Sequence, residues 1–352
     1  MRKSGNQTKQ RLKMKSDKST ARLRKIVESF SGLTVAVLAD LVADEFVFGE
    51  ISRVSREAPV LILKHRERTV LPGGGANAIN NLADLGVKVL PVGVVGEDEA
   101  GDALIDMFKR KRIPLDGIVR DKTWRTVTKT RILAGMTHTS RQQVVRIDHE
   151  PENDFSSQAK RKLEQAAQAY LGRSKALLIS DYGYGAATPE LVKGLKRTRA
   201  VPLVLDSRYR LLEYSGVTAA TPNEPEVENA LRVEIGNDWA KLRWAANEVM
   251  ARMKLDSLLI TRGRDGMVVK LGNEVVDIPI YGSDQVVDVT GAGDTVIATF
   301  TAALAAGADA VDAAHLANYA GGMVVMKRGT ATVSGPELLH ALETSAPVRR
   351  KH

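Results

Sequence analysis

The chain has 352 residues, 43% of them hydrophobic and 26% charged, which is an ordinary globular composition and excludes wholesale disorder. It contains no cysteine, which excludes disulfides, thiolate metal sites, iron–sulfur clusters and cysteine nucleophiles. Aromatic residues make up only 5%, so a nucleic-acid surface built from stacked aromatic side chains is not expected.

The formal charge of +9 is concentrated at the two ends of the chain. Residues 1–30 contain ten Lys and Arg but only two acidic residues, and residues 349–352 add three more basic ones. The remaining residues, 31–348, hold 38 basic and 40 acidic side chains, so we expect no nucleic-acid partner. We predict a basic, partly disordered extension at 1–30, one folded domain at 31–348 and a basic tail at 349–352.

The sequence shows no sign of a membrane partner. No stretch approaches the ~20 apolar residues that cross a membrane. The basic N-terminus lacks the apolar segment and the small-residue cleavage site of a secretory signal. We therefore expect a cytoplasmic location.

Helical and strand-like patterns alternate along the chain. In order, the sequence predicts a helix at 19–30, a strand at 33–39, small strands in 41–64, a helix from Gly75, a strand at 89–95, a helix at 103–111, strands in 129–147, a helix at 157–171, a strand at 176–180, a helix at 191–196, strands at 202–205 and 218–221, a helix at 239–253, strands at 258–261, 267–270 and 274–278, and helices after Thr290. Most of these strands are uniformly apolar, which is typical of a parallel sheet covered by helices on both faces. The amphipathic segments at about 41–65 and 119–148 do not fit that sheet, and we interpret them as one small β-sheet lid. The predicted fold class is α/β.

Polar residues follow several of the predicted strands. In a parallel α/β sheet, ligands bind beyond the carboxyl ends of the strands. The residues at these positions are Asp40, Asp181, Asp206, Asn223, Arg262 and Asp288.

The sharpest motif is Asp-Val-Thr-Gly-Ala-Gly-Asp-Thr at 288–295, which an apolar helix follows. Its glycines allow a tight turn, and the N–H groups of Gly291, Ala292 and Gly293 fall at a helix N-terminus, where the helix dipole adds positive potential. A phosphoryl group with developing negative charge fits such a site. Asp294, in the first turn, can accept a proton from an attacking hydroxyl. The motif predicts a phosphoryl-transfer site.

This motif resembles the second signature of the PfkB/ribokinase family of carbohydrate kinases. The family's first signature is also present, in Gly73–Asn77, Leu85-Gly86, Gly93, Gly96, Asp98 and Gly101, about 220 residues earlier. Asn223–Glu226 resembles the family's N-x-x-E motif, and Thr261-Arg262-Gly263 resembles the strand end near the nucleotide. The resemblance covers roughly residues 31–342. It implies a ribokinase-like three-layer α/β sandwich with a β lid.

Finer features resemble the D-glycero-D-manno-heptose 7-phosphate kinases within this family. They are Ser52–Ser55 with Glu57–Val60, Ser180-Asp181-Tyr182, Lys129-x-Arg131, and Lys327 with the segment 329–334. The chain departs from that pattern at Tyr184, where these kinases carry lysine, and at Ser207-Arg208, which replaces Pro-Lys. Seven residues, 134–140, are inserted after Leu133.

The resemblance implies transfer of the ATP γ-phosphate to the anomeric hydroxyl of a heptose 7-phosphate. Asp294 would be the base, and Gly291, Ala292 and Gly293 would form the anion hole. The expected acceptor-binding residues fall into two groups. Asp40, Asp44, Gly74 and Asn77, with Asp181, would hold the sugar, whereas Arg53, Lys129, Arg131 and Arg208 would bind its phosphate.

The nucleotide side of the site is likewise assigned by resemblance. Asn223 and Glu226 would organise Mg²⁺ through water, because Mg²⁺ keeps several of its waters. Arg262 and Gly263 would lie near the phosphates, together with Thr290. Asn318 and Gly322, with Gly321, would line the adenine slot. Asp288 and Thr290 are candidates for a monovalent cation, K⁺. The family also implies a homodimer formed through the lid.

Other functions remain as alternatives at this point. A PfkB-type kinase for another sugar is one. A dehydrogenase is another, because Gly73-x-Gly75-x-x-Ala78 matches a loose dinucleotide fingerprint with acidic residues about twenty positions on. A third alternative is a non-enzymatic scaffold that binds nucleic acid through its basic tails. The chain lacks the motif G-x-x-x-x-G-K-[ST], which excludes a Walker-type kinase. It also lacks the motif His-x-Gly-His, so the second, nucleotidyltransferase activity of some relatives is not expected.

Overall fold

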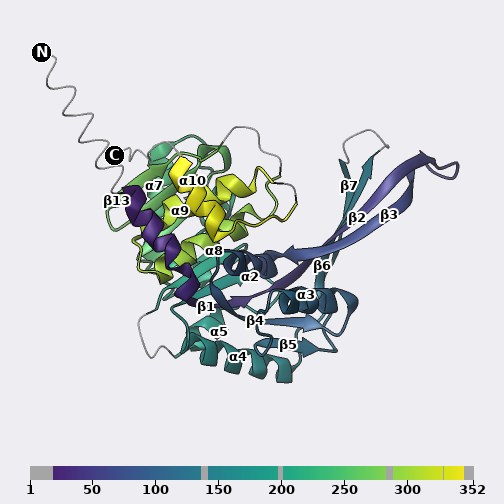
Figure 1. Cartoon of the computed structure of the whole chain (residues 1–352), viewed down its shortest axis with the longest axis horizontal. Helices are drawn as coiled ribbons and strands as arrows, with labels where there is room; N and C mark the ends of the chain where they lie inside the picture. Colours follow the sequence, from purple (N-terminus) through teal and green to yellow (C-terminus); the bar gives the residue numbers. More distant parts are fainter. Residues whose placement is uncertain (1–18, 136–141, 197–200, 283–287, 328, 345–352) are drawn as a thin grey trace, which may run out of the picture.

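The computed structural model describes residues 19–135, 142–196, 201–282, 288–327 and 329–344. Within these residues, nine strands form the central sheet, in the order β13-β12-β11-β10-β9-β8-β1-β4-β5 (Figure 1). The strands are β1 (Thr34–Ala39), β4 (Lys88–Gly96), β5 (Ile118–Asp121), β8 (Ala176–Asp181), β9 (Leu203–Ser207), β10 (Ala219–Ala220), β11 (Ser257–Thr261), β12 (Met267–Leu271) and β13 (Glu274–Ile278). All neighbours pair in parallel except at β12 and β13, which form an antiparallel edge. The mainly parallel sheet is therefore confirmed.

Helices cover both faces of this sheet. The helices are α2 (Gly74–Asp84), α3 (Glu99–Arg110), α4 (Ser157–Leu171), α5 (Pro189–Gly194), α6 (Glu224–Leu231), α7 (Trp239–Met253), α8 (Ala292–Ala305), α9 (Ala310–Val324) and α10 (Gly335–Thr344). Side chains of α2, α3, α8, α9 and α10 belong to one buried cluster, and those of α4, α5, α6 and α7 to another. Strand residues alternate between the two clusters: Val35 and Val37 of β1 belong to the first, and Ala36 and Leu38 to the second. The result is the expected three-layer α/β sandwich.

The lid is a separate four-stranded sheet, in the order β3-β2-β6-β7. Its strands are β2 (Leu41–Val54), β3 (Leu61–Gly73), β6 (Val127–Gly135) and β7 (Gln142–His149). The outer ends of β2 and β3 extend away from the body (Figure 1). The expected lid segments need correction at two ends: β3 continues to Gly73, and residues 119–121 belong to β5, which pairs with β4 in the central sheet.

The expected domain boundary at residue 31 falls inside the packed body. Residues 19–28 form a helix, and Leu23, Val27 and Phe30 are buried in the same cluster as α8 and α9. Arg22 also donates to Asp312 at 2.5 Å. The helix therefore packs against the body through its regularly spaced apolar residues, although its composition is basic. Residues 1–18 and the predicted tail at 349–352 lie outside the described residues.

The fold bears on the dinucleotide fingerprint that the glycine run matches loosely. The glycine run at 73–75 follows β3, a strand of the lid, rather than a strand of the central parallel sheet, so the context that a dinucleotide fingerprint requires is missing. Among the described residues, no helix is long and apolar enough to span a membrane.

Candidate active site

The N-terminus of α8 is built without a side-chain cap. Gly291 is its N-cap residue, with φ +79°, a conformation that favours glycine. A Cβ at Gly291 would lie 2.5 Å from Asn77 Nδ2, so the close approach of α2 also requires glycine here. A Cβ at Gly293 would meet nothing within 4 Å, which leaves space above the first turn. Because the first N–H groups of a helix lack partners within it, this turn can bind an anion.

The three predicted anion-hole residues are not equivalent. The N–H of Ala292 donates to the carbonyl of Val289 at 3.2 Å, so it closes the turn. Within the described residues, no hydrogen bond engages the N–H groups of the glycines on either side, Gly291 and Gly293. Asp288 supports the turn from below, because its carboxylate accepts the N–H groups of Thr290 at 2.9 Å and Gly329 at 3.1 Å.

Asp294 lies one residue further along α8 and is only 4% exposed. Asn77 Nδ2 donates to its Oδ2 at 2.9 Å, and the Tyr182 hydroxyl donates to its Oδ1 at 2.9 Å. Burial raises the pKa of Asp294 to about 7, although both hydrogen bonds lower it. A carboxylate that titrates near neutral pH is suited to act as a general base.

Asn77 is itself held by a buried chain of hydrogen bonds. Asn81, one turn further along α2, donates to the Asn77 carbonyl at 2.9 Å and to its Oδ1 at 3.2 Å. The Thr295 hydroxyl donates to Asn81 Oδ1 at 2.8 Å. This chain fixes the Asn77 amide with its Nδ2 toward Asp294. Asn77 therefore positions Asp294, in addition to any contact with an acceptor.

The lid supplies a group of charged side chains beside Asp294. Arg131 of β6 donates to Asp44 of β2 at 2.6 Å, and both side chains are largely buried. Lys129 lies opposite Asp44 in the β2–β6 register, and its Nζ is 5.5 Å from the centre of the Tyr182 ring. Burial and the nearby Arg208 lower the pKa of Lys129. Within the described residues, no hydrogen bond or ion pair joins the Lys129 ammonium to an acidic partner, whereas the charge of Arg131 is compensated by Asp44.

Gly73 and Gly74 are needed for close packing at this point. A Cβ at Gly73 would lie 2.6 Å from Asp44 Cγ, and a Cβ at Gly74 would lie 3.1 Å from the Tyr182 ring. Gly74 also has φ +49°. Gly74 was expected to contact the sugar; the structure shows it making room for Tyr182.

Asp40 was expected to hold the sugar, and its carboxylate is bonded to the protein's own backbone. It is 2% exposed and accepts the N–H groups of Tyr182 at 2.8 Å, Tyr184 at 2.9 Å and Ala186 at 2.8 Å. Burial nevertheless raises its pKa to about 6. Asp40 thus fixes the path of the loop that follows β8.

Asp181, also expected on the acceptor side, is bonded within the protein in the same way. Its side chain is 1% exposed and forms an ion pair with Arg210 at 2.5 Å. It also accepts the Ser207 hydroxyl at 2.8 Å and the Gly183 N–H at 2.9 Å. These bonds join the ends of β8 and β9 beneath the site.

Arg53 lies too far from Asp294 to act with it within one chain. It is exposed and pairs with Ile62 near the outer end of the lid. Nine residues separate it from Asp44, or about 30 Å along a strand at about 3.3 Å per residue. Arg208, in contrast, follows β9 and lies close enough to Lys129, Tyr182 and Glu226 to influence or be influenced by their charge.

The nucleotide side of the site begins at α6. Asn223 and Glu226 form a capping box: Glu226 N–H donates to Asn223 Oδ1 at 2.8 Å, and Asn223 N–H donates to Glu226 Oε2 at 2.9 Å. Burial raises the pKa of Glu226, and the hydrogen bonds from Asn223 and the charge of Arg208 reduce this rise. Asp206 lies nearby, one residue before the end of β9. Loss of solvent and the adjacent carboxylates Glu226 and Asp294 hold its pKa well above the usual range.

These side chains are compatible with Mg²⁺. They offer amide and carboxylate oxygens, the donors that Mg²⁺ takes. Among the described residues, no group of three or more His, Asp or Glu side chains is arranged to enclose a metal. Asn223 and Glu226 would therefore hold Mg²⁺ in part through water and phosphate oxygens, where it would neutralise phosphate charge.

Three of the expected nucleotide-binding residues have structural partners. Arg262 donates to Glu224 at 2.6 Å, and its guanidinium lies 6.0 Å from the Trp239 ring centre, so it joins α6 to α7. Asn318 donates to the Pro279 carbonyl at 2.8 Å. A Cβ at Gly322 would lie 2.1 Å from the Tyr281 carbonyl oxygen. Asn318 and Gly322 thus hold the segment 279–281 against α9, and Gly263, with φ +53°, begins the turn after β11.

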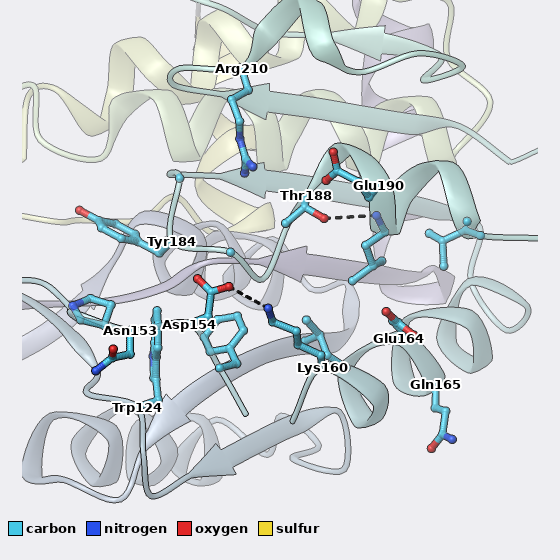
Figure 2. A pocket seen from close by; sticks show the side chains of 18 of the residues that line it. Trp124, Asn153, Asp154, Lys160, Glu164, Gln165, Tyr184, Thr188, Glu190 and Arg210 are labelled. Atoms are coloured by element: carbon cyan, nitrogen blue, oxygen red, sulfur yellow. Dashed lines mark hydrogen bonds and ion pairs between the residues drawn. The ribbon is translucent and has the colours of Figure 1, made fainter. Parts of the chain in front are cut away.

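A large cavity lies beside this cluster rather than within it. It has a volume of about 1200 Å³ and lies between the loops at 150–155 and 183–185 and helices α4 and α5 (Figure 2). Tyr184 and Arg210 are among the residues that line it. Asp294, Asn77 and Lys129 do not line it.

Tyr182 and Asp206 were not among the predicted site residues. Asp206 was noted as a strand end, and Tyr182 as part of a motif. The signal that could have found Tyr182 is its place directly after a buried strand, where the carboxyl ends of parallel strands meet.

The fold is that of ribokinase-like kinases. The phosphofructokinase-2 from Escherichia coli in complex with potassium superposes with a TM-score of 0.69 over 88% of this chain and 98% of that chain, at 16% identity. The Arabidopsis thaliana ribokinase complexed with ribose and ATP superposes with a TM-score of 0.67 over 89% and 99%, at 18% identity.

The sequence assigns the chain more closely. The model of the pfkB family of carbohydrate kinases matches residues 42–337, and the chain belongs to that family. It is therefore a carbohydrate kinase, and kinases of this family use ATP and Mg²⁺. This family membership makes the chain a kinase rather than a dehydrogenase.

The chain is also similar to proteins named "Bifunctional protein HldE". The one from Geobacter sulfurreducens is 39% identical over 328 residues, and the one from Koribacter versatilis is 37% identical over 331 residues. These alignments cover 91% and 93% of this chain but 66% of each relative. The chain thus spans just under two thirds of their length.

Proposed function

We propose that the protein phosphorylates D-glycero-β-D-manno-heptose 7-phosphate at its anomeric hydroxyl to give the 1,7-bisphosphate. The observation that carries the proposal is the cluster at the N-terminus of α8. A buried carboxylate, Asp294, adjoins open N–H groups there, and two cations, Lys129 and Arg208, lie beside it. A sugar that already bears a phosphate would place that anion against the two cations.

The transfer itself follows from these positions. Asp294 accepts the proton of the acceptor hydroxyl while the hydroxyl oxygen forms its bond to the γ-phosphorus. The bond between that phosphorus and the β,γ-bridging oxygen breaks, and the electron pair leaves with ADP. Gly291 and Gly293 donate N–H groups toward the oxygens of the transferred group, where negative charge develops.

The acceptor site takes a form that differs from the expectation. We assign sugar hydroxyls to Asp44, which faces the site from the lid, and to Arg131 beside it. Lys129 and Arg208 are assigned to the phosphate. Arg208 would take over the charge that related kinases supply with lysines at 184 and after Asp206, the two positions at which this chain departs.

An acceptor screen tests this proposal. ADP release with Mg-ATP should give a larger kcat/KM for a heptose 7-phosphate than for fructose 6-phosphate or any unphosphorylated sugar. Lys129→Met should raise KM for the phosphorylated acceptor by about tenfold or more, as expected for the loss of a charge-assisted bond. A higher kcat/KM for fructose 6-phosphate would instead favour the second candidate, a PfkB-type kinase with another substrate.

The lid also supports a homodimer, which we propose as the working form. Six of the most exposed large hydrophobic side chains in the described residues lie on it: Val54, Val60, Leu61, Val144, Val145 and Ile147. An apolar surface of this kind is typical of an interface. Light scattering should show a dimer that Val145→Glu dissociates, whereas a monomer at working concentration would contradict the proposal.

The candidate monovalent-cation site at Asp288 and Thr290 is a further part of the proposal. Asp288 links the anion-binding turn to Gly329, so K⁺ bound at this point would stiffen the turn. Exchange of K⁺ for tetramethylammonium should lower kcat; an unchanged kcat would remove the site from the account. We place the reaction in the cytoplasm, where ATP is supplied.

A further inference from the structure

We propose that Tyr182 is a positioning residue for catalysis, whose hydroxyl fixes the Asp294 carboxylate and favours its ionised form. This inference rests on the proposed role of Asp294 as the base. Nothing in the signature motifs assigns such a role to a tyrosine. The argument depends on what holds Tyr182, what it holds, and which charges surround the carboxylate.

The main chain of Tyr182 is fixed at the end of β8. Its N–H donates to Asp40 Oδ2 at 2.8 Å, and the next two bonds to Asp40 come from Tyr184 and Ala186. A buried carboxylate thus sets the path of the loop, because each of its oxygens is bonded to that loop's backbone. The buried Asp40 carboxylate therefore fixes the position from which the Tyr182 side chain extends.

The Tyr182 ring is confined as well. Gly74, with its positive φ, leaves room for the ring, since a Cβ there would be 3.1 Å away. Lys129 Nζ lies 5.5 Å from the ring centre, within range of a cation–π interaction. With its ring and backbone both held, the hydroxyl can donate in only a narrow range of directions.

The hydroxyl completes a two-sided clamp on Asp294. Asn77 of α2 donates to Oδ2 and Tyr182 donates to Oδ1, both at 2.9 Å, while Asp294 itself is carried by α8. Two donors from different elements fix the plane of the carboxylate. Each carboxylate oxygen can accept more than one hydrogen bond, so a lone pair remains to accept the proton of the acceptor hydroxyl.

The surroundings of Asp294 oppose its ionisation, so its ionised form needs a hydrogen-bond donor. The groups that face it from the packed elements are Asp44 of β2, Lys129 of β6, Asp206 of β9 and Tyr182 itself. Asp44 and Asp206 oppose ionisation of Asp294, and burial opposes it most strongly; Lys129 favours it. Tyr182 remains a donor throughout the neutral range, because partial burial and then Asp294 raise its own pKa well above the usual value.

Tyr182→Phe tests the inference, and two readouts are needed. The base must be ionised, so kcat/KM rises with pH through the pKa of Asp294. This rise is the acid limb of the pH profile. Loss of the hydrogen bond should move its midpoint upward by about one pH unit, the scale of a hydrogen bond to a charged group. Activity at pH 7 should fall about fivefold, because the ionised fraction of Asp294 drops from about a half to about a tenth, and it should recover largely at pH 9, with KM for ATP unchanged.

The second readout is independent of activity. A ¹³C NMR titration of labelled aspartate, assigned with Asp294→Asn, should show the same upward shift of the Asp294 pKa in substrate-free protein. It tests Tyr182 even if Asp294→Asn proves active and the proposed function fails. Conversely, a correct shift with the wrong acceptor would leave the inference standing and overturn only the substrate.

Tyr184→Phe is the matched control, because it removes a tyrosine hydroxyl two residues away on the same loop. That hydroxyl donates to Glu150 at 2.8 Å and does not reach Asp294. The acid limb and the NMR titration should not move in this variant. If Tyr182→Phe fails to fold, 3-fluorotyrosine in place of Tyr182 provides a stronger donor of nearly the same shape and should shift the limb downward. An unmoved Asp294 titration in either folded variant would overturn the inference.

Discussion

The carboxylates that follow the strands differ in what occupies their oxygens. Asp40 and Asp181 accept hydrogen bonds from loop backbone, Ser207 and Arg210, so they build the loops on which the site rests. Asp44 and Asp294 face the site. All four look alike in the sequence, because each is an aspartate near an apolar run. Which oxygens are already bonded depends on loops that sequence periodicity does not describe.

Arg210→Ala should destabilise the protein without removing a group that contacts substrate. It leaves the Asp181 side chain, 1% exposed, without its ion-pair partner, which costs about 3 kcal/mol of unfolding free energy for a buried charge. Urea unfolding measures this loss. Arg66→Ala is the control, because its pair with Glu50 is exposed and should contribute less than about 1 kcal/mol. Equal losses in the two variants would contradict the structural assignment of Asp181.

Among elements, the turn into α8 was the easiest to predict. Its glycines, the acidic residue and the apolar helix are contiguous, so the local sequence alone specifies the geometry. The partners of Asp294 were harder, because Asn77 and Tyr182 come from α2 and the end of β8. Asn77 was found through a motif with a sugar-binding role; its bond to Asp294 depends on the packing of α2 against α8.

Gly291→Ala and Gly293→Ala should separate the two glycines of this turn. At Gly291 the added methyl group meets Asn77 and the backbone has φ +79°, so we expect a loss of about 1–2 kcal/mol in unfolding free energy. At Gly293 it meets nothing, so stability should change little while kcat falls, because the methyl group occupies the anion site. Thermal unfolding with ADP-release kinetics measures both, and equal destabilisation would contradict this reading of the turn.

The lid illustrates the limit of periodicity. Alternation predicted a separate sheet correctly, but it did not distinguish the lid from β5, a four-residue strand that pairs with β4 at the edge of the central sheet. Alternating apolar residues fit either sheet. Only the pairing partner, which is remote in sequence, decides the assignment.

At the scale of the whole molecule, composition was misleading at the N-terminus. Residues 1–30 are basic, yet the helix at 19–28 is part of the core and forms ion pairs with α9 and α10. Arg22 and Arg24 account for those pairs, so part of the basic charge has a structural partner. The two signature motifs, in contrast, lie about 220 residues apart in the sequence, and the fold joins them through the hydrogen bond from Asn77 to Asp294.

Leu23→Ala should show that this helix belongs to the domain. Leu23 is 2% exposed, so its truncation should cost about 2–5 kcal/mol, the usual range for a buried leucine. Lys25→Ala on the exposed side of the same helix should change the unfolding free energy by less than about 0.5 kcal/mol. Urea unfolding of both proteins measures the difference. A Leu23 variant as stable as the Lys25 variant would place the helix outside the cooperative unit.

Proton transfer to Asp294 is the step on which the whole account depends. The most direct test is the turnover of Asp294→Asn with Mg-ATP and the best acceptor from the screen, alongside calorimetric titration of ATP. We predict that kcat falls at least about a hundredfold, the usual effect of losing a general base, while ATP affinity stays within about threefold of the wild type. A variant that keeps a tenth or more of the wild-type kcat would contradict the assignment of Asp294 as the base.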